Sequence, residues 1–195
     1  MLFNSIHFLL FLPIVVAAYF AIPHRYRWVL LLGASYYFYM SWSAKYAILI
    51  VTSTVVDYFA ALAMARAAPG LKRRLLLGAS LLANLGLLFA FKYLEFAFSS
   101  IDALLGAFNM SIGLPELDIL LPVGISFYTF QTLSYTIDVY RGERDPERHF
   151  GIFALYVSFF PQLVAGPIER STRLLPQLHA RHDFDARRVV KGLQL

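Results

Sequence analysis

The sequence predicts an all-α, polytopic integral membrane protein built as a single domain. Hydrophobic residues make up 59% of the 195 residues and charged residues only 15%, and the mean hydropathy is +0.62. A soluble domain averages about 45–50% apolar and about 25% charged residues. The apolar residues also come in long runs that are separated by short basic segments. Runs of this kind are typical of membrane-spanning helices.

Five apolar runs are predicted to span the membrane, where about 20 residues per helix are usual. They cover roughly residues 6–22, 28–42, 46–65, 75–91 and 119–140. From Tyr93 to Phe108, apolar and polar residues follow each other with helical period. A straight helix from the start of the fourth run to Phe108 would be about 50 Å long, which exceeds the bilayer. We therefore expect a bend near Lys92, followed by an amphipathic helix in the membrane interface.

Composition excludes several kinds of site. The chain has no cysteine, which removes disulfides, thiolate metal sites and cysteine nucleophiles. It contains no phosphate-binding loop, no HExxH motif and no GxGxxG motif, so we expect neither a metal nor a bound cofactor. The net charge of +5 comes from Lys and Arg in short loops between apolar runs. Such loop charge is ordinarily an orientation signal, and we expect no nucleic-acid partner.

The distribution of basic residues predicts the orientation of the chain. The loops 23–27 and 66–74 are basic, whereas segment 92–118 has one lysine against four acids. Because cytoplasmic loops carry the excess of Lys and Arg, the N-terminus and segment 92–118 are predicted outside. Both basic loops are then cytoplasmic, and so is the Arg-rich loop that follows Tyr140.

Asp57 is the only acidic residue well inside the first four runs. An intramembrane carboxylate is by default a hypothesis of function. The alternative is that Asp57 pairs with a basic side chain that reaches in from Arg66 or from a neighbouring helix. The sequence leaves both interpretations open.

The fifth run carries two polar stripes. Gln131, Ser134 and Asp138 fall within about 60° of each other on a helical wheel. The second stripe consists of Thr129, Thr132 and Thr136. Little of this helix can face lipid, so we expect it inside a bundle or beside a wet cavity. Hydrogen bonds between helices account for the threonines, and Asp138 has the alternative of pairing with Arg141 at i+3.

The sixth apolar run, residues 150–167, is broken by Pro161. If it spanned the membrane, the six basic residues of the tail 168–195 would lie outside, against the orientation rule. We therefore predict a re-entrant element that returns to the cytoplasmic face, followed by a cytoplasmic tail. Irregular backbone at membrane depth is tolerated inside protein or beside a water-filled cavity, so residues 159–167 are expected to line a cavity.

Several stretches are specific enough to indicate a family. The central ones read LPVGISFYTFQTLSYTIDVYRGE and FFPQLVAGPIER, and the chain opens with MLFNSIHFLLFLPIVVAAYF and RYRWVLLLGASYYFYMSW. Together they resemble the membrane-bound O-acyltransferase family, in the branch that acetylates alginate and related exopolysaccharides. The resemblance covers essentially the whole chain. It implies that the chain is the N-terminal part of a single, longer transmembrane domain.

The resemblance implies an O-acyltransferase of the bacterial inner membrane, acting on an exported polysaccharide such as alginate. Family members transfer an acyl group to a hydroxyl through a tunnel that crosses the membrane core. The implied acyl donor, acetyl-CoA or a similar compound, is a substrate presented on the cytoplasmic side. The implied acceptor is a polysaccharide or an acyl-acceptor protein outside, and membrane lipid is the remaining partner.

The resemblance places the catalytic histidine outside this chain. In the family an intramembrane histidine acts as a general base, in a later segment that also carries a Trp-His pair. The histidines here are His7, His24, His149, His179 and His182. None lies in an apolar run with that motif, so we expect the catalytic residue beyond Leu195 and no acyl transfer by the chain alone.

Five residues that match or adjoin the family motifs are candidates for tunnel lining or substrate contact. They are Gln131, Asp138, Arg141, Gln162 and Arg170. Helix packing and loop anchoring are the alternative roles for these side chains.

Two further functions suit parts of the pattern. A transporter or channel subunit would also use kinked helices, an intramembrane acid and a re-entrant element, although we see no inverted repeat. A non-catalytic membrane scaffold would use the stripe of small residues in the fourth run, which lets helices approach closely. That stripe consists of Ala79, Ala83, Gly86 and Ala90.

Overall fold

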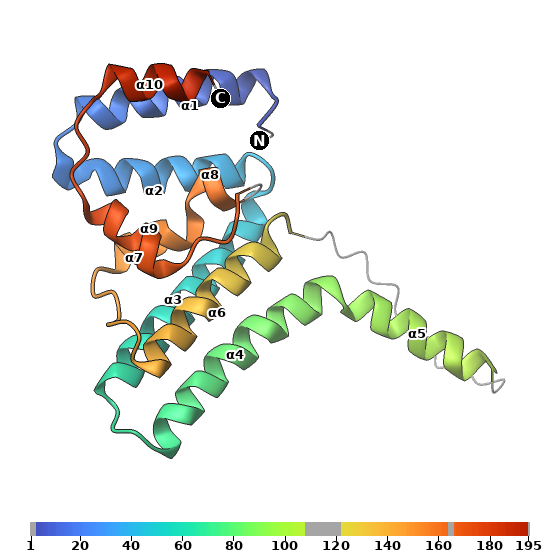
Figure 1. Cartoon of the computed structure of the whole chain (residues 1–195). Coiled ribbons are helices and arrows are strands. Elements are labelled where there is room, and N and C mark those ends of the chain that lie inside the picture. Colours follow the sequence, from blue (N-terminus) through green and yellow to red (C-terminus); the bar gives the residue numbers. More distant parts are fainter. Residues whose placement is uncertain (1–2, 108–121, 164–165, 195) are drawn as a thin grey trace.

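The computed structural model describes residues 3–107, 122–163 and 166–194, and within these ranges it contains helices and no strands (Figure 1). The elements are α1 (Ile6–Ala21), α2 (His24–Met40), the 3-10 helix η1 (Ala44–Tyr46), α3 (Ala47–Arg66), α4 (Leu71–Lys92), α5 (Leu94–Ala107), α6 (Ile125–Arg141), α7 (Phe150–Ser158), α8 (Phe160–Leu163), α9 (Ser171–His179) and α10 (Ala186–Leu193). The all-α prediction is confirmed for this part of the chain.

Two of the five predicted spans are long and apolar enough in the described residues to cross a membrane. They are Ala44–Arg66, which joins η1 to α3, and Leu71–Lys92, which is α4. Helix α1 is apolar but has 16 residues, and α2 and α6 have 17 residues each. At 1.5 Å per residue such helices cover about 25 Å of a hydrocarbon core of about 30 Å. A count of five spans therefore stays a prediction.

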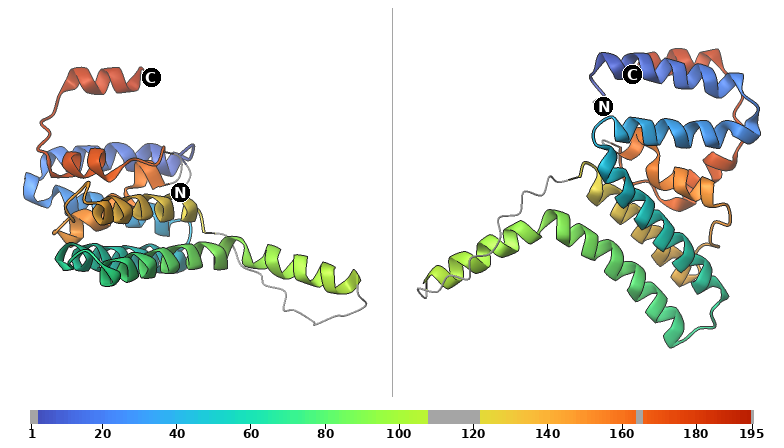
Figure 2. Two further views of the ribbon diagram at one scale, coloured as in Figure 1. Left: turned by 60° about the horizontal axis from the view of Figure 1, so that its bottom comes forward. Right: turned by 180° about the vertical axis from the view of Figure 1, so that it is seen from behind.

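The predicted bend near Lys92 is confirmed. Helix α4 ends at Lys92 and α5 begins at Leu94, after Tyr93. Helix α5 points away from the other helices and extends alone in all three views (Figures 1 and 2).

Helix α6 begins later than the sequence predicted. Its first residue is Ile125, and residues Pro122 to Gly124 precede the helix in a turn. Gly124 adopts φ +78°, a left-handed conformation that favours glycine and ends the turn. The predicted start of this helix at residue 119 is therefore wrong. Residues 119–121 themselves lie outside the described part of the chain.

Helices α3, α4 and α6 form the centre of the structure, and each packs against the other two. Helix α7 packs against α2, α3 and α9, so that it closes the remaining side of α3 and α6 (Figure 1). The core is rich in tyrosine, with Tyr128, Tyr135 and Tyr156 fully buried. The prediction that α6 lies inside a bundle is confirmed.

The break in the sixth apolar run lies at Phe159 rather than at Pro161. Proline lacks an N–H and is tolerated in the first turn of a helix, and Pro161 takes the second position of α8. The hydroxyl of Ser35 on α2 accepts a hydrogen bond from the backbone N–H of Phe160 at 3.2 Å. A side chain from a neighbouring helix therefore satisfies a backbone group that the break leaves free.

The outer surface of the helices is strongly apolar. On α1, Ile6, Leu9, Leu10 and Ile14 are 61–77% exposed, and Leu82 on α4 is 76% exposed. Soluble monomers rarely expose large contiguous apolar surfaces, so this surface needs lipid or further protein to cover it.

Gly86, in the small-residue stripe of α4, makes no close helix contact within the described residues. Helix α4 turns Ser80, Asn84 and Leu88 towards α3 and α6. A Cβ added at Gly86 would meet no atom within 4 Å. The close approach predicted for this stripe is therefore not made at Gly86 by the described part of the chain.

Candidate functional site

Asp57 lies at the centre of a buried polar cluster that joins three helices. Its carboxylate accepts hydrogen bonds from the amide of Asn84 at 2.8 and 2.9 Å and from the hydroxyl of Ser80 at 2.5 Å, both on α4. The Asn84 carbonyl oxygen in turn accepts from Ser53 on α3 and, at 3.5 Å, from Thr132 on α6. All five side chains are at most 1% exposed.

The partners of Asp57 are neutral, which corrects one of the two interpretations. The sequence suggested a basic partner from the Arg66 end or from a neighbouring helix, but the described partners are an amide and a hydroxyl. With three hydrogen bonds from α4 and no exposure, Asp57 holds α3 against α4. The threonine stripe is buried as expected, although of its members only Thr132 has a hydrogen bond to another helix among the described residues.

Gly124 brings the two central motifs together, and Gly166 makes a close contact within the second motif. A Cβ at Gly124, before α6, would lie 2.6 Å from the carbonyl oxygen of Leu163 in α8. A Cβ at Gly166 would lie 2.7 Å from the Cα of Gln162. The turn into α6 and the end of α8 therefore touch backbone to backbone, at positions where only glycine fits.

Gln131 and Gln162 are the two predicted tunnel residues that the fold buries. The amide of Gln131 donates to the backbone carbonyl of Tyr156 at 2.8 Å, which joins α6 to α7. Gln162, on α8, is 7% exposed, and neither its amide nitrogen nor its oxygen has a partner in the described residues. An unpaired buried amide is costly, so Gln162 is the side chain best placed to meet a ligand or a further segment of protein.

The other three predicted site residues, Asp138, Arg141 and Arg170, are half-buried or exposed. Asp138 is half-buried on α6 and forms no ion pair with Arg141 in the described structure. Arg141 instead pairs with Glu143 at 3.8 Å, with both side chains more than half exposed. Arg170 is exposed and precedes α9. Among the described residues no hydrogen bond or ion pair joins any two of the five candidates, and their role in a tunnel stays a prediction.

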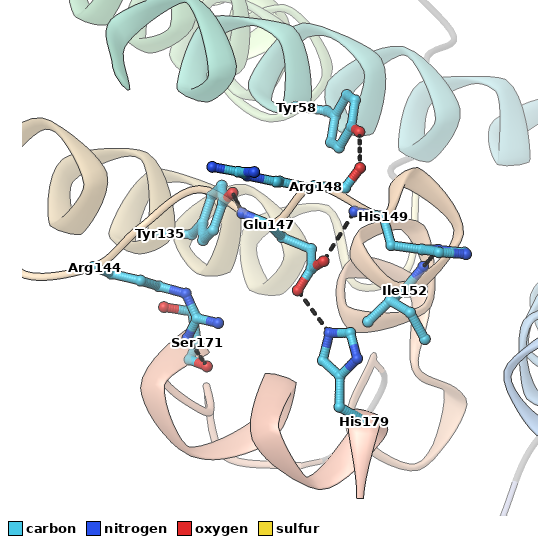
Figure 3. Close-up of polar contacts among 9 residues, drawn as sticks. All are labelled: Tyr58, Tyr135, Arg144, Glu147, Arg148, His149, Ile152, Ser171 and His179. Carbon is cyan, nitrogen blue, oxygen red and sulfur yellow. Dashed lines mark hydrogen bonds and ion pairs between the residues drawn. The ribbon is translucent and has the colours of Figure 1, made fainter. Parts of the chain in front are cut away.

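A polar junction that sequence reasoning missed lies in the loop between α6 and α7 (Figure 3). The carboxylate of Glu147 contacts Nε2 of His179 on α9 at 2.8 Å and accepts from the backbone N–H of His149 at 2.9 Å. Its own backbone N–H donates to the hydroxyl of Tyr135 at 2.8 Å. The Glu147 side chain is 10% exposed and that of His179 50%, so the carboxylate is shielded from solvent and the imidazole only in part.

Two further contacts complete this junction (Figure 3). The Arg144 guanidinium donates to the backbone carbonyl of Ser171 at 2.5 Å, at the start of α9. The hydroxyl of Tyr58 on α3 donates to the carbonyl of Arg148 at 2.5 Å. Helix α7 follows this loop directly, and α9, which comes later in the chain, therefore packs against the same loop. The available sequence signal was the run of charges between Arg141 and His149, which marks a loop but not its distant partners.

A cavity of about 580 Å³ lies between α1, α2, α7, α8 and the two last helices. Apolar side chains such as Leu12, Val16 and Phe160 line one part of it. Four of the five histidines line it as well, namely His24, His149, His179 and His182. A second cavity, lined by Arg66 and Arg148 among others, lies at the end of α3. Within the described residues no three His, Asp or Glu side chains are grouped in a way that could hold a metal ion.

The chain is similar in sequence to several known proteins. A protein of Azotobacter vinelandii named probable alginate O-acetylase is 40% identical over 190 residues, which is 95% of this chain and 38% of that protein. The protein of the same name from Pseudomonas aeruginosa is also 40% identical over 190 residues, or 95% of this chain and 36% of its own length. A peptidoglycan O-acetyltransferase of Helicobacter pylori is 32% identical over 227 aligned positions, covering 99% of this chain and 42% of that protein.

Over 95% of its length the chain is homologous to members of the membrane-bound O-acyltransferase family. The resemblance read from the two central motifs is thereby confirmed. The chain spans about two fifths of the length of the curated relatives that it matches. No family model matches it, and no solved structure is similar to it. In this chain, the contact of Gly124 with the Leu163 carbonyl shows how the two motifs meet.

Proposed function

We propose that this O-acyltransferase chain forms part of the wall of a membrane-embedded reaction chamber that transfers acetyl groups to an exported polysaccharide such as alginate. The observation that carries the proposal is the 40% identity to alginate O-acetylases along almost the entire chain. The acyl donor, acetyl-CoA or a similar compound, is met on the cytoplasmic side and the acceptor, a polysaccharide or carrier protein, outside. The catalytic histidine is supplied by sequence beyond Leu195, so the chain alone is inactive.

The proposed orientation has the N-terminus outside the bacterial inner membrane, with five spans. It is supported by the grouping of the segments that are proposed to be cytoplasmic. The guanidinium of Arg27 donates to the backbone carbonyl of His182 in the tail at 2.6 Å. Arg73 donates to the carbonyl of Tyr140 at the end of α6 at 2.7 Å. Both basic loops, the loop after α6 and the tail thus share one end of the bundle.

The length of α7 and the contacts of the segments beside it support the proposed re-entrant element. Helix α7 has nine residues, about 13 Å, which is less than half the thickness of a hydrocarbon core. The segment begins directly after the loop that holds Glu147, and α9, which follows the segment, is held to the same loop through Ser171 and His179. The unpaired Gln162 in α8 then faces the proposed chamber.

A chimera tests the proposed function. The matching segment of the Azotobacter vinelandii protein is replaced by this chain and expressed in cells that lack their own alginate O-acetylase. We expect acetyl esters to return to the exported alginate, measured by NMR of the purified polymer. The chain expressed by itself serves as the second arm and is expected to give no acetyl esters.

The outcomes separate the parts of the proposal. Acetyl esters from the chain alone would overturn the assignment of the catalytic residue to another segment. A chimera that inserts into the membrane but leaves both alginate and peptidoglycan unacetylated would overturn the enzymatic role. That result would favour a transporter subunit or a scaffold.

A further inference from the structure

The cavity between α1, α2 and α8 has one apolar part and one basic part. Leu12 and Val16 of α1 and Phe160 of α8 line the apolar part. Arg25 and Arg27, at the start of α2, line the other. A molecule that fills this cavity therefore needs both an apolar body and an anionic group.

Arg27 is the residue that defines the anionic end. Its guanidinium lies 4.6 Å from the ring centre of Tyr19 and 5.7 Å from that of Phe20. Among the described residues no acidic side chain forms an ion pair with it. Arg27 is half-buried, and only its Nε and Nη1 donate to backbone carbonyls. A fixed guanidinium without an acidic partner and with spare donors is well suited to bind a phosphate.

The apolar part of the cavity adjoins the apolar outer surface of α1. Leu12 and Val16 line it and are each still 38% exposed, on the helix whose outer face is apolar. From Leu12 to the end of α1 is ten residues, or about 15 Å along a helix, which is half of a hydrocarbon core of about 30 Å. The apolar part therefore has the depth of one leaflet, and its basic end lies where the headgroups of that leaflet would be.

We infer that this cavity binds a glycerophospholipid of the cytoplasmic leaflet, with an acyl chain against Leu12, Val16 and Phe160 and the phosphate on Arg27. His24, which lines the same basic end, supplies a further hydrogen-bond donor for the headgroup, whereas Nε2 of His182 already contacts the backbone carbonyl of Gln177. Asp183 and Asp185 lie at the rim, but Arg181 and Arg188 pair with them. The inference depends on the membrane embedding proposed above and not on acyl transfer.

Lipid photocrosslinking and native mass spectrometry test this site. The chain is reconstituted in nanodiscs that contain phosphatidylethanolamine with a diazirine in one acyl chain. We expect crosslinks within residues 12–20 and at 159–160, mapped by peptide sequencing. Arg27→Gln removes a charge-assisted contact and is expected to lower phospholipid occupancy roughly tenfold. Val16→Trp fills the apolar part and is expected to abolish the crosslinks.

Matched controls keep the test specific. Arg74→Gln removes an exposed arginine from the other basic loop, and Val51→Trp enlarges a 41% exposed valine on α3. Neither residue lines the cavity, and both variants are expected to keep the occupancy of the unmodified chain. Resistance to carbonate extraction, measured for every variant, reports membrane embedding separately from lipid binding.

Three results would overturn the inference. One is equal occupancy in Arg27→Gln, Val16→Trp and their controls. Another is crosslinking confined to the outer face of α1 without any at residues 159–160. The third is palmitoyl-CoA protecting these peptides at lower concentration than phospholipid does, because the cavity would then be an acyl-thioester site.

Discussion

The carboxylate of Asp57 on α3 accepts two hydrogen bonds from the side-chain amide of Asn84 on α4, at 2.8 and 2.9 Å. The two residues are 27 positions apart, and both are at most 1% exposed. Ser53 and Thr132 complete the pairing by contacting the Asn84 carbonyl oxygen. One amide therefore holds three helices together at the centre of the bundle.

Replacing Asp57 is expected to destabilise the bundle. Asp57→Ala leaves the Ser80 hydroxyl buried without its acceptor and leaves the Asn84 amide with only the Ser80 backbone carbonyl, and a buried group without a partner costs about 1–3 kcal/mol. We expect the midpoint of thermal unfolding in detergent to fall by at least about 5 °C. Asp102→Ala, which removes an exposed acid from α5, is the control and should leave the midpoint unchanged. An unchanged midpoint for Asp57→Ala would contradict the role of Asp57 in holding α3 against α4.

Gly124 is expected to tolerate alanine less well than Gly142. Both have nearly the same left-handed φ, +78° and +77°, so alanine strains both backbones by about 1–2 kcal/mol. At Gly142 a Cβ meets nothing within 4 Å, whereas at Gly124 it lies 2.6 Å from the Leu163 carbonyl. Gly124→Ala should therefore lose about 1–3 kcal/mol more than Gly142→Ala in chemical unfolding. Equal losses would show that the contact between the two motifs does not constrain the fold.

Gly151 fixes the distance between α7 and α2. A Cβ at this position would overlap Cζ3 of the Trp28 ring. Alanine inside a helix is normally favoured over glycine by roughly 0.5–1 kcal/mol, but the clash should reverse the sign. We expect Gly151→Ala to lower the unfolding midpoint, Gly86→Ala on the open face of α4 to leave or raise it, and Trp28→Leu to relieve the defect of Gly151→Ala. No relief would mean that another contact sets the distance.

Glu147 is expected to hold the tail against the rest of the chain. Glu147→Ala removes the contact to His179 and the acceptor for the His149 N–H, a loss of about 1–3 kcal/mol because the group is shielded. Glu143→Ala breaks an exposed pair that contributes about 0–1 kcal/mol. Hydrogen exchange at residues 171–179 should therefore speed up in Glu147→Ala and not in Glu143→Ala. Equal protection in both variants would contradict this assignment.

Gln162 is expected to matter for activity more than for folding. Its amide has no partner within the described residues, so Gln162→Ala should keep the unfolding midpoint within about 1 °C or raise it. In the chimera described above, acetyl transfer should fall at least tenfold if Gln162 meets a ligand or a further segment of the enzyme. Gln194→Ala, an exposed position in the tail, serves as the control. Full acetyl transfer by Gln162→Ala would leave this glutamine without a role in the chamber.

Local patterns in the sequence determined the helices. The apolar runs predicted α1 to α4 within a few residues, and the change of period after Lys92 predicted α5 as a separate helix. Two polar stripes predicted that α6 is buried. These features depend on neighbours three or four positions apart, which the sequence states directly. The start of α6 was misplaced because the left-handed turn at Gly124 interrupts an apolar run without changing its composition.

Only the tertiary structure decided which distant groups meet. The sequence offered a basic partner for Asp57, yet the fold supplies Asn84 and Ser80 from the next helix. The sequence named Gln131 and Arg170 together as candidates for tunnel lining. In the fold, Gln131 is buried and Arg170 is exposed. The pair of Glu147 and His179 and the cavity beside Arg27 had no signal along the chain. The physical reason is that such contacts are set by how helices pack, and packing joins residues whose separation in sequence carries no information about their distance.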